Sequence, residues 1–238
     1  MINELNNLIK INKSEVLRYL EYKGQVISSD LDNTINNCIQ ITKEKINPRY
    51  ILRVYPIFRN KEEYDNEIKI KGTNVILKSK DIYNLLKDCD SCAVIASTLG
   101  IEIEKEIRKY SYLELTKSII IDACATTAIE EICDIVQNDL KEKLTKQEKY
   151  ITYRYSPGYG DLPISVNEDI ISMLNASKEI GLTITEKGIM LPRKSVIAII
   201  GISKNKTKKS KKSCSNCLNK DNCKYRKGDD SCEYKGIC

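Results

Sequence analysis

The feature that most restricts the fold of this chain is an expected helix over residues 112–144, whose middle part, residues 118–135, is apolar around most of its circumference. A surface helix shows one apolar stripe, so a helix with this pattern lies in the interior of a protein. Residues 195–203 form an extended segment that is apolar on both faces, which is typical of a strand covered on both sides. The chain must therefore enclose one long helix and one strand between other elements.

The rest of the 238-residue chain alternates between extended and helical patterns. Further strands are expected at residues 50–57, 67–71, 75–77, 92–100 and 150–155, with short extended pieces at 183–185 and 189–191. Further helices are expected at residues 14–22, 29–45, 79–87, 101–110 and 165–180. Ser29 with Asp32 is interpreted as a capping box that opens the second of these helices. Ser165 with Glu168 is interpreted in the same way for the last one, which Gly181 is expected to end.

This order of elements predicts an α+β domain over residues 1–203, with a largely antiparallel sheet and helices packed around it. Residues 204–212 hold six lysines and are expected to be a linker, and residues 213–238 form a cysteine-rich tail. The six lysines equal the net charge of +6, so the domain itself is close to neutral and no nucleic-acid-binding surface is expected on it. The linker is either a solvated spacer or a contact for an acidic partner or nucleic acid.

No histidine occurs in the chain. This excludes Ser-His and Cys-His nucleophile pairs, and it excludes a protein imidazole as the ligand of a heme or a corrinoid. No run approaches the roughly 20 apolar residues that span a bilayer, and residues 1–4 do not begin a secretion signal. We therefore expect a cytoplasmic protein without a membrane partner, whose ten cysteines are not paired in disulfides.

The tail carries five cysteines, Cys214, Cys217, Cys223, Cys232 and Cys238. The first two have the CxxC spacing with which a tight turn places two thiolates on one metal. The third, with either the fourth or the fifth, would complete a tetrahedral site. Four thiolates suit zinc or an iron–sulfur cluster, and both remain open. In the domain, Cys38 and the pair Cys89 and Cys92 are expected to be buried core residues.

Residues 154–163 hold two prolines, two glycines, two tyrosines, an arginine and an aspartate. Pro157 and Pro163 exclude a helix and a regular strand, so the segment predicts a rigid loop between a strand and a helix. Its glycines admit a ligand close to the backbone. Arg154 can hold an anion with its planar fork, and Tyr159 offers a ring face and a hydroxyl. A Pro/Gly turn without a ligand is the alternative.

Two motifs resemble the activation domain of cobalamin-dependent methionine synthase. They are Arg154-x-x-Pro157-Gly158-Tyr159 and Thr185-Glu186-x-x-x-Met190-x-Pro192-x-x-Ser195-Val196. The resemblance is firm over residues 150–203 and looser over 90–140, and residues 98–100 resemble a segment of standalone members of the family. It does not include the cysteine-rich tail. Gly160 stands where the loop of the family commonly has a second proline, and we expect this replacement to loosen the loop.

In that family the Arg-x-x-Pro-Gly-Tyr loop binds S-adenosylmethionine, so the resemblance implies roles for four residues here. Arg154 would pair with the carboxylate of this methyl donor. The backbone of Ser156 and Gly158 would contact its adenosine or methionine portions. Tyr159 would pack near the sulfonium and the cobalt, as the residue nearest the reaction.

Glu130 and Glu131 stand out on the long helix, because carboxylates within an apolar helix are costly unless they are paired. One is expected to face solvent, and the other could reach the Arg154 loop or the ammonium group of a ligand. In the family, a glutamate of the corresponding helix contacts the methionine part of S-adenosylmethionine. A structural salt bridge is the alternative for either residue.

The resemblance implies an S-adenosylmethionine-binding subunit for the reductive methylation that reactivates cobalamin-dependent methionine synthase, in methionine biosynthesis. No cobalamin-binding signature is evident here, so the corrinoid would be carried by that enzyme or by another corrinoid protein. An electron donor such as flavodoxin or ferredoxin would reduce it. Two alternatives are an iron–sulfur redox accessory protein that passes electrons to a corrinoid protein, and a metal-stapled binding module.

Overall fold

The computed structural model describes residues 2–59 and 66–205. Six strands form one sheet in the order β3-β2-β1-β4-β8-β5, and every neighbouring pair in it is antiparallel. Two short strands, β6 and β7, pair with each other in a separate hairpin. The strands are β1 Arg49–Arg59, β2 Glu67–Ile70, β3 Ile76–Lys78, β4 Ser91–Thr98, β5 Tyr150–Ile151, β6 Thr183–Ile184, β7 Met190–Leu191 and β8 Ser195–Ser203.

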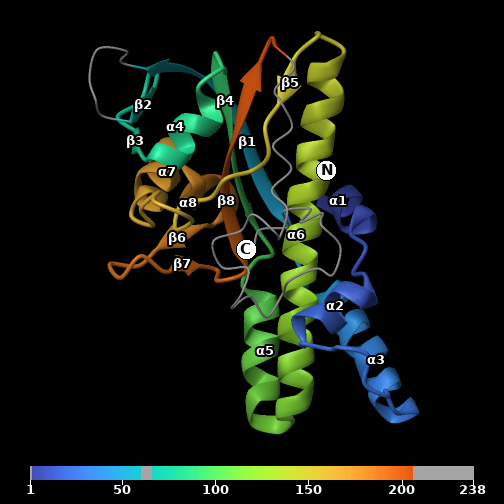
Figure 1. The fold of residues 1–238 in the computed structure, drawn as a ribbon. Helices are drawn as coiled ribbons and strands as arrows, with labels where there is room; N and C mark the ends of the chain where they lie inside the picture. The colour runs from blue at the N-terminus through green and yellow to red at the C-terminus, as the bar shows by residue number, and fades with distance from the viewer. Residues whose placement is uncertain (1, 60–65, 206–238) are drawn as a thin grey trace.

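Helices cover both faces of the main sheet (Figure 1). Helix α6 packs on one face together with α2, α3 and α5, while α4, α7 and α8 pack on the other. The expected α+β architecture is confirmed. The helices are α1 Ile2–Leu8, α2 Lys13–Tyr19, α3 Ser29–Lys45, α4 Lys80–Leu86, α5 Glu102–Leu113, α6 Leu115–Thr145, α7 Val166–Leu174 and α8 Ala176–Ile180.

Strand β4 shows how one segment serves both helical layers. Ala93 and Ile95 belong to the core under α6, whereas Val94 and Ala96 belong to the core under α4 and α7. Successive side chains of a strand point to opposite faces, so a central strand between two layers is apolar throughout. β8 pairs with β4 along its length and follows the same rule, which confirms the expected strand over residues 195–203.

Some expected helix boundaries are wrong. Ser28, and not Ser29, caps α3 with its side chain. Ser165 has a helical backbone and makes no side-chain capping hydrogen bond, so the second capping box does not form. The last expected helix is divided at Asn175, whose left-handed backbone (φ 52°, ψ 38°) ends α7 and begins α8. Gly181 ends α8 in the left-handed conformation, as expected.

The segment after α6 pairs with the sheet over residues 150–152 and again at Tyr155. Tyr150 and Ile151 form β5, and Tyr155 returns to the sheet through an isolated bridge to Ile199. The expected strand over residues 150–155 is therefore interrupted, and this leaves Arg154 free of a regular ladder. Helix α1 was not expected. None of the helices described between residues 2 and 205 is long and apolar enough to cross a membrane.

Gly201 in β8 should be intolerant of a side chain. A Cβ built on it would lie 2.5 Å from Cys89 Sγ and 2.7 Å from Leu86 Cδ2. We expect Gly201→Ala to lower the free energy of unfolding by about 1–3 kcal/mol, because an added methyl group overpacks the core. Urea denaturation measures the loss. The double variant Gly201→Ala/Cys89→Ala should lose less than the sum of the two single variants, and simple additivity would contradict this explanation.

Candidate functional site

Residues 154–163 form a compact loop that runs from the end of β5 to α7, as the sequence predicts. The Gly158 amide donates to Leu162 O at 2.8 Å, and the Leu162 amide donates to Tyr159 O at 3.0 Å. Gly158 has φ +93°, a conformation that residues with a Cβ rarely adopt, so a glycine is required here. Gly158 is exposed, and Ser156 and Tyr159 are half-buried, so a ligand can reach the backbone of the loop.

Arg154 begins the loop and has only 3% of its side chain exposed. Its guanidinium donates to Asp134 Oδ1 at 2.7 Å, to Gln137 Oε1 at 3.2 Å and to Glu130 Oε2 at 3.4 Å. Burial alone would lower the pKa of Arg154, but the ionised Cys133 thiolate, which exists only at high pH, and the carboxylates of Asp134 and Glu130 raise it above its usual value. All three acceptors belong to α6, so this charged side chain ties the loop to the long helix.

Of the two glutamates, Glu130 is the one whose carboxylate contacts Arg154 of the loop. It is buried and contacts Arg154, whereas Glu131 is partly exposed. The structural salt bridge that the sequence left open is therefore present, and it involves Glu130. Beside it, Cys133 Sγ lies 3.3 Å from Ser97 Oγ, and burial raises the pKa of this thiol to about 12. The thiol is thus uncharged near neutral pH, and the negative charge around Arg154 comes from carboxylates.

A polar stripe runs along the apolar middle part of α6. Its members are four residues apart and therefore share one side of the helix: Asp122, Thr126, Glu130 and Asp134. Lys194, just before β8, lies 2.9 Å from Asp122 Oδ1 and donates to Thr126 Oγ1 at 2.8 Å, while Arg154 contacts the other two. Lys194 and Asp134 were not expected from the sequence to contribute to the site. The spacing of polar residues within an apolar helix was the signal that could have revealed the stripe.

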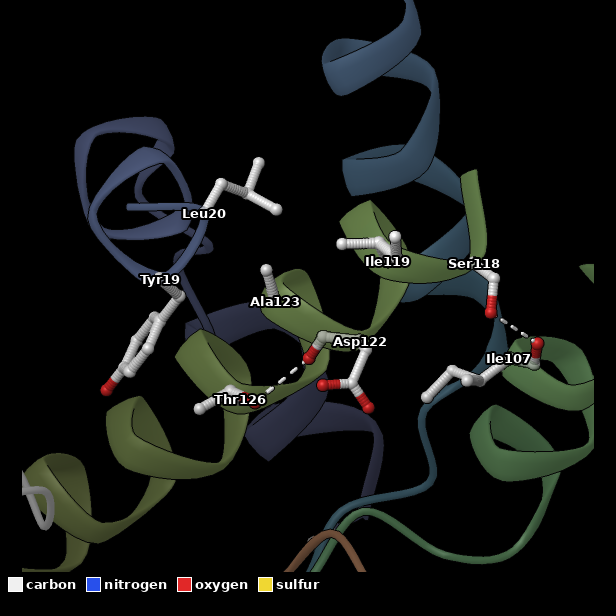
Figure 2. A pocket seen from close by; sticks show the side chains of 8 residues that line it. All are labelled: Tyr19, Leu20, Ile107, Ser118, Ile119, Asp122, Ala123 and Thr126. Carbon is white, nitrogen blue, oxygen red and sulfur yellow. Dashed lines mark hydrogen bonds between the residues drawn. The ribbon is translucent and has the colours of Figure 1, made fainter. Parts of the chain in front are cut away.

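Two cavities lie beside this stripe. One, of about 450 Å³, has Tyr19 and Leu20 on one side and Ile107 of α5 on the other, with Asp122 of α6 between them (Figure 2). A second, of about 590 Å³, shares Ile107 and Asp122 and is also lined by four cations, Lys105, Arg108, Arg193 and Lys194. Residues of α5 and α6 line both cavities, and residues just before β8 line only the second. The loop of residues 154–163 belongs to neither lining.

Within residues 2–59 and 66–205, no group of three or more acidic or cysteine side chains could hold a metal ion. Cys38, Cys89 and Cys92 are buried free thiols, as expected for core residues. The expected metal ligands lie outside the described residues, as does most of the lysine-rich linker, so the metal site stays a prediction. These ligands are Cys214, Cys217, Cys223, Cys232 and Cys238.

Removing a partner of Arg154 should cost more stability than breaking a surface ion pair on the same helix. We expect Asp134→Ala to lower the free energy of unfolding by about 1.5–3 kcal/mol, because it removes the shortest hydrogen bond of a buried charge. Asp139→Ala breaks an exposed pair with Lys143 and serves as the control, with a cost below about 0.5 kcal/mol. Urea denaturation compares the two, and equal losses would show that Asp134 does not hold Arg154.

The geometry can be compared with known proteins. The chain is similar to the crystal structure of the MetH reactivation domain bound to AdoHcy, with a TM-score of 0.62 and 16% sequence identity, over 84% of this chain and 75% of that chain. At this identity the likeness shows a shared fold. No curated protein matches the chain by sequence. The family model described as "Vitamin B12 dependent methionine synthase, activation domain" matches residues 36–224, which include Cys214, Cys217 and Cys223 of the tail. Because this match covers most of the sequence, the chain belongs to the activation-domain family of vitamin B12-dependent methionine synthase.

Proposed function

We propose that this chain binds S-adenosylmethionine at the base of the loop of residues 154–163 and serves the reductive methylation of the corrinoid of a cobalamin-dependent methionine synthase. The observation that carries the proposal is a pair of opposite charges, in which Arg154, the first residue of the Arg-x-x-Pro-Gly-Tyr loop, contacts Glu130 of α6. The family match supports it, as does the fold shared with a reactivation domain whose structure contains AdoHcy.

The methionine end of the donor carries a carboxylate and an ammonium group. A guanidinium binds a carboxylate with two parallel hydrogen bonds, and a glutamate accepts from an ammonium. The contact of 3.4 Å between Arg154 and Glu130 is the longest of the three that Arg154 makes. A bound zwitterion would replace this weakest contact with charged hydrogen bonds on both sides. Glu131, at the next position of α6, is the alternative partner for the ammonium.

The loop would supply the rest of the site. The backbone of Ser156 and Gly158 would contact the adenosine or methionine portions, and the half-buried Tyr159 would pack near the sulfonium and the cobalt. A sulfonium leaves without an acid catalyst, so the task of these residues is to hold the methyl group in line with its acceptor. A site of this kind needs no histidine.

The methyl acceptor would be the corrinoid of a partner protein in the cytoplasm. A flavodoxin or ferredoxin would supply one electron to it, and S-adenosylhomocysteine would leave after methyl transfer. The tail of residues 213–238 is proposed to hold zinc or an iron–sulfur cluster. An iron–sulfur cluster would favour the alternative of a redox accessory protein, because a cluster bound by the cysteines of the tail could pass electrons to a corrinoid protein. The visible absorption spectrum of anaerobically purified protein separates a coloured cluster from colourless zinc.

Calorimetry with S-adenosylmethionine tests the charged pair. Arg154→Lys keeps the positive charge but loses the planar fork, and Glu130→Gln removes the negative charge at nearly constant size. We expect either change to weaken binding by about 1.5–3 kcal/mol, the value of charged hydrogen bonds. Arg53→Lys is the control, because Arg53 of β1 makes an exposed ion pair with Glu179 of α8. Affinities equal to that of the control would remove Arg154 and Glu130 from the proposed site.

A reconstituted reaction tests the proposed activity as a whole. The protein is mixed with cobalamin-loaded methionine synthase that lacks a working activation domain, S-adenosylmethionine and reduced flavodoxin. Methylcobalamin should form, as followed by its absorption spectrum, and Arg154→Lys should slow its formation. Binding of the donor without any methylcobalamin would contradict a catalytic role and leave a donor-binding protein.

A further inference from the structure

The side of the loop that faces away from α6 is held to α4 by side chains distant in sequence. Tyr155 has 1% of its surface exposed. Its hydroxyl lies 3.0 Å from Asp81 Oδ2 and 3.0 Å from the main-chain carbonyl of Tyr159, so it can share its proton between a helix and the tip of the loop. Successive residues thus point to opposite layers: Arg154 reaches α6, and Tyr155 reaches α4.

Asp161 makes a second link to the same helix. Its carboxylate accepts from Ser79 Oγ, from the Lys80 amide at 2.7 Å and from the Asp81 amide at 3.2 Å. Ser79 Oγ in turn accepts from the Ile82 amide at 3.1 Å. The amides at the start of a helix lack partners within the helix, so a carboxylate placed there is strongly held. Desolvation acts to raise the pKa of Asp161, but these hydrogen bonds outweigh it and lower the pKa below its usual value.

Gly160 lies between the two links, and its lack of a side chain makes the link between Tyr155 and Asp81 possible. It has φ +52°, and a Cβ built on it would overlap both the Asp81 carboxylate and the Tyr155 hydroxyl. This is the position at which the sequence suggested a loosened loop. The structure gives the residue a different role, because a side chain there would occupy the place of the hydrogen bond between Tyr155 and Asp81.

We propose that these residues form a polar clasp, made of Ser79, Asp81, Tyr155, Gly160 and Asp161, that sets the binding conformation of the loop before a ligand arrives. The ligand part of this inference rests on the proposed binding of S-adenosylmethionine. The clasp residues are positioning residues and do not contact the donor. A loop that is already ordered loses little conformational entropy on binding, so the clasp raises affinity without adding a contact to the ligand.

The loop amides report on the clasp without any ligand. Hydrogen exchange over residues 156–164, followed by mass spectrometry, should show the Gly158 and Leu162 amides protected in the wild type, since both donate within the loop. Tyr155→Phe and Asp161→Ala should each speed this exchange by about tenfold, because local opening becomes easier. Asp161→Asn keeps an acceptor oxygen, and asparagine caps helices about as well as aspartate, so it should restore most of the protection.

Gly160→Ala has a matched control in Gly72→Ala. Both glycines have positive φ, but a Cβ on Gly72 meets nothing within 4 Å. Both variants therefore carry a strained alanine, and only Gly160→Ala disturbs the clasp. We expect Gly160→Ala to weaken binding of S-adenosylmethionine by at least about tenfold, and Tyr155→Phe by about threefold to tenfold, as for the loss of one hydrogen bond. Gly72→Ala should bind as the wild type does.

The outcomes separate the clasp from the function. Faster loop exchange together with weaker binding supports the clasp as a positioning device. Unchanged exchange in Tyr155→Phe and Asp161→Ala overturns it, whatever the affinity. If the wild type does not bind S-adenosylmethionine but the variants still lose loop protection, the proposed function fails, while the ordering role of the clasp is supported.

Discussion

The guanidinium of Arg154 carries a full charge in a place with almost no solvent. A buried charge is tolerated only where opposite charges or hydrogen-bond acceptors pair with it. Asp134, Gln137 and Glu130 do so, and all three come from one helix. The loop can therefore leave the sheet only where α6 presents these acceptors. The packing of the long helix and the shape of the proposed site are two results of the same contact.

That contact would be of little use to a ligand if the rest of the loop were loose. Tyr155 and Asp161 hold the loop from the other layer of helices, through Asp81 and Ser79 of the α4 region. A short chain segment is thus held by α6 on one face of the sheet and by α4 on the other. Figure 1 shows these two helices on opposite faces. Its glycines permit the tight path, and side chains remote in sequence hold it there. Gly158 stays exposed, so a ligand can approach the backbone of the loop there.

Local chemistry made much of this arrangement predictable. Prolines and glycines marked the loop, and continuous apolar runs marked the buried helix and β8, because these signals depend on neighbours in sequence. Ser165 fitted a capping pattern but has a helical backbone, since its place is set by the turn before α7. The choice of Glu130 over Glu131 depends on how α6 is rotated against the sheet. Lys194 had no local signal, because its partners lie on another element.

The polar stripe on α6 has a mechanical consequence. Lys194 contacts the stripe at Asp122 and Thr126, and Arg154 contacts it two helical turns later, at Glu130 and Asp134. A rotation of α6 about its axis would turn these partners away from both cations. A slide by one helical turn, about 5.4 Å, would not, because the four-residue repeat would bring another carboxylate of the stripe to each cation. Lys194 and Arg154 therefore fix the rotation of α6 against the sheet, while the regular spacing of the stripe makes its position along the axis depend on the apolar packing around it.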